Sequence, residues 1–136
     1  MSIRDRKVKW KSICMPALWT SWRNPGTFGK LLLQSGSFRF NDTGYEEFHP
    51  ALGPVVDFVN DFRENPAAVA ERVFVTCGRY ESLIADNRAL QTPLRRSGMR
   101  LRYRESRDGH NWENWRDGLR EALGWLFPGP LGLVYE

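Results

Sequence analysis

Apolar residues along this chain recur at helical spacing in several segments. Where they fall three or four positions apart, they form one stripe of an α-helix. This pattern covers residues 51–65, 81–98 and 111–127. A further helix is predicted over 16–26, where a proline stands in the first turn and Asn-Pro-Gly closes the segment.

Shorter apolar runs between these helices are typical of β-strands. Residues 30–37 and 72–78 each hold such a run, followed by loop-forming residues. Residues 99–106 alternate apolar side chains with arginines, which predicts a strand with one wetter face near a sheet edge. A weaker strand is predicted over 6–10.

Strands and helices therefore alternate along the chain. That order predicts an α/β fold, with a mostly parallel sheet and helices on both faces. Pro93 is expected to kink or shorten the helix over 81–98, and Gly98 to end it. Asn111 is the expected N-cap of the last helix. A length of 136 residues suits a single domain spanning the whole chain.

The composition is typical of an ordinary globular protein. Hydrophobic residues make up 41% and charged residues 26%, which argues against disorder. No apolar run approaches the length of about 20 residues that a membrane span needs, and the basic N-terminus is not followed by an apolar stretch. We therefore expect a cytoplasmic protein without a membrane partner. Cys14 and Cys77 are expected to be reduced thiols, and because neither has a second cysteine or a histidine at ligand spacing, no zinc site is expected. No cofactor is expected either.

The formal net charge of +4 raises the question of nucleic-acid binding. Basic residues gather in segments 4–11 and 95–104. A continuous basic face would favour a nucleic-acid partner. Because acidic residues interrupt the rest of the sequence, no nucleic-acid partner is expected.

Candidate chemistry follows two of the predicted strands. Gly78-Arg79-Tyr80-Glu81 comes after one strand, and Asp108-Gly109-His110 after the next. Because parallel strands end at the same edge of a sheet, Glu81 and His110 should lie on neighbouring loops there. A carboxylate beside an imidazole is the acid–histidine half of a catalytic triad.

Other interpretations of these residues stay open. His110 could simply be a polar cap, and Glu81 a first-turn residue favoured by the helix dipole. Asp86 and Asp108 are competing carboxylates. Asp86 lies at the turn into its helix, and Asp108 is too close in sequence to face the ring of His110 easily.

Three longer stretches, residues 24–38, 72–106 and 108–127, resemble the C-terminal half of an esterase family of α/β-hydrolases. This family includes enterochelin esterases and feruloyl esterases, and the resemblance covers residues 16–127. Its most specific part is Gly-His-Asn-Trp-Glu-Asn-Trp-Arg-Asp-Gly-Leu, which begins at residue 109. The resemblance implies an α/β-hydrolase-like fold and a serine hydrolase acting on small carboxylic esters.

Individual roles follow from the same resemblance. It implies His110 as general base and Glu81 as acid of a Ser-Glu-His triad. Arg79, Tyr80 and Trp112 are the expected substrate-binding residues. Trp112 and Trp115 match aromatic positions beside the histidine, although plain core packing is an alternative for both.

The sequence departs from the family pattern at the nucleophile. The family places its serine in a Gly-x-Ser-x-Gly elbow before the helix predicted at 16–26. Ser12 lies close to that position, in Trp-Lys-Ser-Ile-Cys-Met-Pro, but has no flanking glycine. Ser35 and Ser37 match a loop after the nucleophile's helix instead.

The chain is therefore expected to correspond to a hydrolase truncated at its N-terminus. Residues 1–15 would be a degenerate or replaced nucleophile region, 16–127 the family-like part and 128–136 a tail. The alternative to an esterase is a catalytically inactive remnant or a ligand-binding module. Half of a doubly wound sheet would also leave a strand edge uncovered, which predicts self-association.

Overall fold

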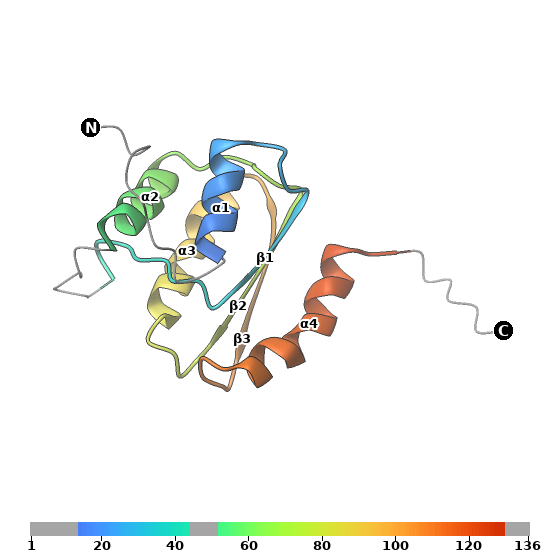
Figure 1. Ribbon diagram of the computed structural model, residues 1–136. Helices are drawn as coiled ribbons and strands as arrows, with labels where there is room; N and C mark the ends of the chain where they lie inside the picture. Colours follow the sequence, from blue (N-terminus) through green and yellow to red (C-terminus); the bar gives the residue numbers. More distant parts are fainter. Residues whose placement is uncertain (1–13, 44–51, 130–136) are drawn as a thin grey trace.

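The computed structural model describes residues 14–43 and 52–129 (Figure 1). Helices and strands alternate in the order that the sequence predicts. The elements are α1 (Cys14–Arg23), β1 (Lys30–Gln34), α2 (Gly53–Glu64), β2 (Arg72–Gly78), α3 (Ile84–Arg96), β3 (Arg100–Ser106) and α4 (Trp112–Leu126). The weak strand predicted over 6–10 lies outside the described residues.

The three strands form one parallel sheet in the order β1-β2-β3. In its register, Leu33 of β1 lies beside Val75 of β2, which lies beside Tyr103 of β3. The prediction of a parallel α/β sheet is therefore confirmed, and so is the position of residues 99–106 near a sheet edge. Within the described residues, β1 forms the opposite edge.

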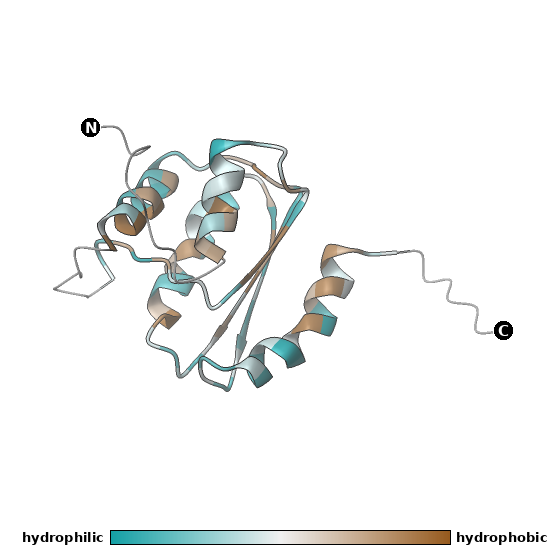
Figure 2. Cartoon of the chain, in the orientation of Figure 1, coloured by the Kyte–Doolittle hydropathy of each residue, from teal (hydrophilic) through white to brown (hydrophobic). Residues whose placement is uncertain are grey.

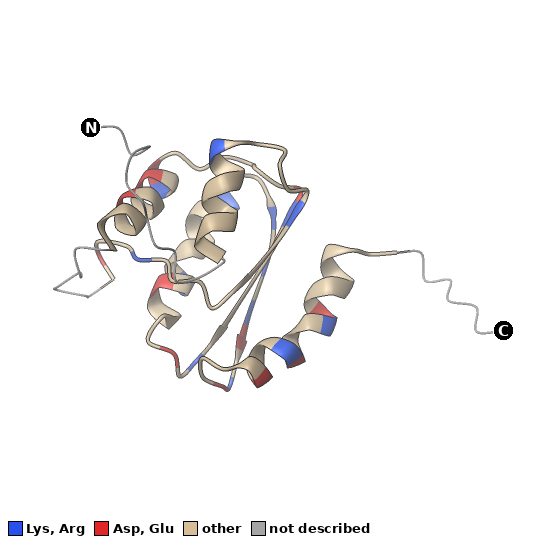
Figure 3. Ribbon diagram, viewed as in Figure 1, with Lys and Arg blue, Asp and Glu red and all other residues tan. Residues whose placement is uncertain are grey.

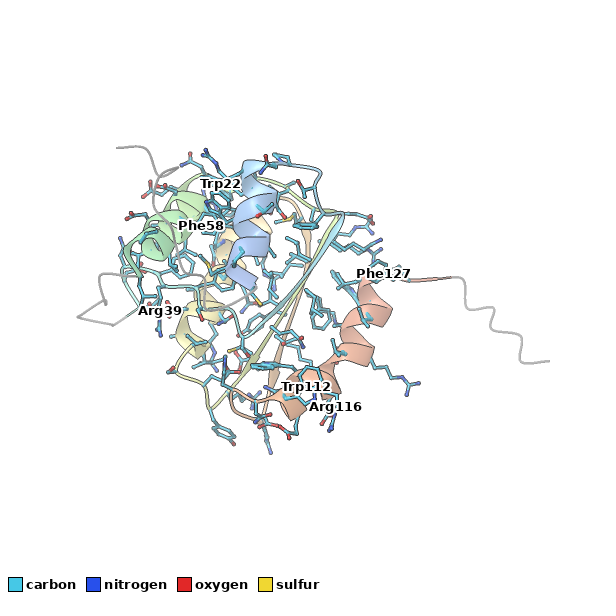
Figure 4. All side chains as sticks on the ribbon, viewed as in Figure 1. Trp22, Arg39, Phe58, Trp112, Arg116 and Phe127 are labelled. Carbon is cyan, nitrogen blue, oxygen red and sulfur yellow. The ribbon has the colours of Figure 1, made fainter. Side chains whose placement is uncertain are left out.

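Helices cover both faces of this sheet, as predicted. α1, α2 and α3 lie on one face and α4 lies on the other (Figure 1). The larger core is under the first three helices, where Trp22 of α1 meets Phe58 of α2 with ring centroids 5.6 Å apart (Figure 4). Figure 2 shows strongly hydrophobic stretches in the sheet, whereas the helices mix apolar and polar residues.

The buried side of α4 differs from the predicted stripe. The apolar stripe expected for this helix was Trp112, Trp115, Leu119, Leu123 and Leu126. Leu126 is buried as expected, but Trp112 and Leu123 are exposed. The other buried residues of α4 are the small Gly118 and Ala122. Small side chains allow the helix to lie close to the strands, so the line of contact follows them rather than the largest apolar residues.

The charged side of β3 faces the same side of the sheet as α4. Arg102 and Arg104 each form an ion pair with Glu121 of α4, at 3.1 Å. Figure 3 shows charged residues of both signs along α4. Arginines along an edge strand also discourage pairing with another chain at that edge.

The N-terminus of α4 and the C-terminus of α3 follow the signals in the sequence. Asn111 caps α4 because its side chain accepts a hydrogen bond from the backbone N–H of Asn114. Gly98, with φ of +85°, follows α3 in the left-handed conformation that favours glycine. Pro93 lies inside α3 and is buried, and the helix continues past it to Arg96, two residues short of the range predicted from the sequence. No helix in the described part of the chain is long and apolar enough to cross a membrane.

Candidate active site

Glu81 and His110 meet at the carboxyl edge of the sheet, on the loops that follow β2 and β3. Oε2 of Glu81 lies 2.7 Å from Nδ1 of His110. Glu81 is only 5% exposed, whereas the side chain of His110 is 53% exposed. A buried carboxylate thus orients a ring that remains open on its other side, which is how the acid–histidine half of a triad is built.

The second oxygen of Glu81 is also occupied. Oε1 accepts a hydrogen bond from the backbone N–H of Gly78 at 2.8 Å and from the hydroxyl of Ser35 at 2.6 Å. α3 begins at Ile84 rather than at residue 81, so Glu81 belongs to the preceding turn and its side chain points inward. The helix-dipole interpretation of Glu81 is therefore not the one that the structure supports.

The geometry also fixes the histidine tautomer. A carboxylate can only accept, so Nδ1 of His110 carries the proton between them, and in the neutral ring the lone pair is then on Nε2. Trp115 of α4 packs edge-on against the imidazole, with ring centroids 4.8 Å apart and planes at 90°. The ring is thus held on one side by a charge and on another by an aromatic edge.

Ser35 occupies a position that the sequence did not reveal. Its hydroxyl accepts a hydrogen bond from the indole N–H of Trp115 at 2.9 Å and donates to Glu81. Ser35 is 2% exposed and therefore supports the acid rather than serving as a nucleophile. The sequence showed only that Ser35 lies in the loop after a predicted strand, where it matches a loop of the esterase family.

Gly78 allows the two site loops to approach each other. A Cβ at this position would lie 2.9 Å from the carbonyl carbon of Asp108 and 2.9 Å from Oε1 of Glu81. Two backbone hydrogen bonds cross the same gap, from Arg79 N–H to Ser106 and from Tyr80 N–H to Asp108. Because Gly78 has no side chain, the two loops can lie close enough to form these hydrogen bonds.

The loop before His110 is stiffened by its own polar residues. Oδ1 of Asp108 accepts hydrogen bonds from the side chain of Asn111 and from the backbone N–H of Gly109, both at 2.7 Å. The hydrogen bond from Asn111 lowers the pKa of Asp108. Asp108 therefore braces the turn, in agreement with the expectation that it does not face the histidine ring.

The other competing carboxylate, Asp86, holds a different loop. It is fully buried in α3 and pairs with Arg39 at 3.0 Å. It also accepts the backbone N–H of Phe40 and the hydroxyl of Thr43. The partners of Asp86 therefore belong to the segment after β1 and do not include the imidazole of His110.

The three expected substrate-binding residues differ in how freely they could meet a ligand. Tyr80 is 74% exposed and Trp112 is 62% exposed. Figure 4 labels Trp112, which is the first residue of α4. Arg79 is turned toward Glu105, at 3.4 Å. Hydrogen bonds from Arg88 hold the pKa of Glu105 at about 2, so this carboxylate remains ionised beside both arginines. Two aromatic side chains are thus available to a ligand, while Arg79 is already paired.

The start of α1 lies at the same edge of the sheet. Sγ of Cys14 lies 3.2 Å from both the backbone N–H and the carbonyl oxygen of Gln34, next to Ser35. Ser12 itself lies outside the described residues. Burial raises the pKa of the Cys77 thiol to about 12, so it is not a reactive thiolate. Among the described residues, no group of three His, Cys, Asp or Glu could hold a metal ion.

Comparison with known proteins supports a distant relation to esterases. No family model matches the chain. Over 55 residues, 40% of this chain, the sequence is 31% identical to an acetyl esterase from Caldicellulosiruptor saccharolyticus. The matched segment spans 21% of that protein's length. The similarity relates the chain to ester hydrolases in general and does not identify a particular family.

Proposed function

We propose that this chain carries the acid–histidine half of a carboxylic ester hydrolase site. The observation that carries the proposal is the 2.7 Å contact between buried Glu81 and half-exposed His110 at the carboxyl edge of a parallel sheet. The partial similarity to an acetyl esterase points to the same chemistry. A small carboxylic ester is the proposed substrate. Exposed Tyr80, which precedes Glu81 in sequence, and exposed Trp112, two residues after His110, are candidate contacts.

In the proposed reaction, Nε2 of His110 takes the proton of a serine hydroxyl as its oxygen attacks the ester carbonyl. Glu81 keeps the resulting imidazolium in place through Nδ1. The imidazolium then protonates the leaving alcohol, which yields an acyl-enzyme. Water, deprotonated by the same nitrogen, releases the carboxylic acid and restores the serine.

Ser12 is the candidate nucleophile. The support is positional, because α1 begins two residues later and its first residue contacts the end of β1 beside Ser35. The 136 residues contain no Gly-x-Ser-x-Gly. An oxyanion hole normally uses the backbone N–H after the nucleophile, and each donor is worth roughly a hundredfold or more in rate. We therefore expect negligible hydrolysis of p-nitrophenyl acetate by this chain alone.

This absence favours a second candidate function, an esterase-like module that binds a ligand without turning it over. A gain-of-function experiment separates the two. Trp10→Gly with Cys14→Gly creates Gly-Lys-Ser-Ile-Gly around Ser12. If Glu81 and His110 form a working acid–base pair, this variant should react with a fluorophosphonate probe at Ser12, as located by mass spectrometry.

Two controls make the result interpretable. Ser12→Ala in the same background should abolish labelling, and so should His110→Ala. Labelling that persists without His110 would contradict its role as the base. No labelling in the elbow variant would favour the binding module, and labelling at Ser35 would contradict its placement behind Glu81.

A further inference from the structure

We propose that Ser35 and Trp115 are positioning residues, which fix the carboxylate of Glu81 and the ring of His110 in their paired orientation. The catalytic meaning of this inference rests on the proposed function. Its structural content does not, because it concerns four side chains that the structure already brings together.

The four side chains form a closed circuit. Trp115 donates to Ser35, Ser35 donates to Glu81, and Glu81 accepts from His110. The circuit closes where the imidazole packs against the same tryptophan in a T-shaped arrangement, with ring centroids 4.8 Å apart. Each of the three strands contributes through the loop that follows it, and α4 supplies the tryptophan.

The direction of each hydrogen bond in this circuit is determined by chemistry. An indole N–H can only donate, and a carboxylate can only accept. The hydroxyl of Ser35, placed between them at 2.9 and 2.6 Å, has its proton aimed at Oε1 of Glu81. Oε2 is then the oxygen left for Nδ1 of His110, so Trp115 acts on the imidazole through two intermediates as well as by direct contact.

The backbone around Ser35 supports a role beyond packing. Ser35 has φ of +48°, in the left-handed region that most side chains avoid. Its N–H is anchored to the carbonyl of Thr76 on β2 at 2.8 Å. Glycine would adopt this backbone more easily, yet the chain places a hydroxyl there and buries it. Strained positions of this kind gather at functional sites.

The tautomer of His110 provides a readout that general packing would not change. Nitrogen-15 chemical shifts of the imidazole report which ring nitrogen carries the proton. The chain contains two histidines, so a His49→Gln background leaves His110 alone in the spectrum. We expect the unmodified site to hold the proton on Nδ1, and the Glu81→Gln variant to lose that preference.

Trp115→Phe is the decisive variant, because it keeps an aromatic ring beside His110 and removes the N–H. We expect the ratio of Nδ1–H to Nε2–H tautomer to fall by about 2- to 10-fold, which is the effect of one ordinary hydrogen bond. Ser35→Gly should cause a similar fall while relieving the strain at φ of +48°. Ser37→Ala, two positions along the same loop, is the matched control and should leave the ratio unchanged.

The inference would be overturned by one combination of results. Glu81→Gln would lose the preference for the Nδ1–H tautomer, while Trp115→Phe and Ser35→Gly would leave the tautomer ratio unchanged. Urea unfolding of each variant separates a local change from loss of the fold, and Ser35→Ala serves if the glycine variant is too unstable. None of these measurements needs a nucleophile. A failed positioning role is therefore distinguishable from a failed esterase proposal, which the labelling of the elbow variant tests.

Discussion

Gly78→Ala tests the closest approach in the site. The added methyl group would lie 2.9 Å from both the carbonyl carbon of Asp108 and Oε1 of Glu81. Ordinary van der Waals contact begins at 3.4 Å, so these neighbours must retreat by about half an ångström or more. The obstacle at Asp108 is backbone, which cannot rotate away as a flexible side chain would.

The expected cost follows from that geometry. Overpacking of this kind destabilises proteins by about 1–3 kcal/mol. We expect the upper part of that range, because Tyr80 N–H is also hydrogen-bonded to Asp108 across the gap. The same displacement would stretch the 2.7 Å contact between Glu81 and His110 beyond about 3.2 Å, the long end of the normal range.

Urea unfolding measures the first effect, and the nitrogen-15 spectrum of His110 measures the second. Gly29→Ala is the matched control, since a Cβ there meets nothing within 4 Å. The control should change stability by less than about 1 kcal/mol. The reasoning is refuted if Gly78→Ala costs no more than Gly29→Ala and leaves the histidine tautomer intact.

Three further outcomes are expected. Glu105→Gln should destabilise the chain by about 1 kcal/mol at pH 7, after allowance for the exposure of its partner Arg88. The folded-state pKa of Glu105 is lowered from 4.5 to about 2. The stability difference between the two proteins in urea unfolding should therefore shrink as pH falls through that interval. A difference that stays constant with pH would contradict the role of Glu105. Phe74→Ala should cost about 3–5 kcal/mol in the same assay, since its fully buried ring seats α4 on the sheet, and a loss below 1 kcal/mol would argue against that packing. Light scattering should detect association through the outer edge of β1, which has no strand partner among the described residues, and a monomer at high concentration would count against it.

Much of the fold could be predicted because the sequence obeys local rules. The alternation of Leu101 and Tyr103 with arginines located the edge strand, and Asn111 marked the start of the last helix. The pairing of Glu81 with His110 followed from parallel strands ending at one edge. These features depend on periodicity, capping and connection order, all of which are visible one segment at a time.

The features that could not be predicted from the sequence depend on how side chains of different segments pack against one another. Gly118 and Ala122 set the depth of α4, so Trp112 and Leu123 became exposed although they share the apolar periodicity. The role of Ser35 required knowing that Trp115 comes to lie above it. No pattern within either segment contains that information. Cytoplasmic location and the role of Ser12 remain predictions.

The circuit around His110 also has a consequence for how the chain folds. Its hydrogen bonds join residues 46, 29 and 80 positions apart, so none belongs to a local turn or helix. Contacts of such high sequence separation are made late and slowly, because long loops must close before they form. The imidazole is therefore oriented only when all three strands and α4 are in place, so the Nδ1 proton of His110 reports on the whole assembled sheet and not on any one segment.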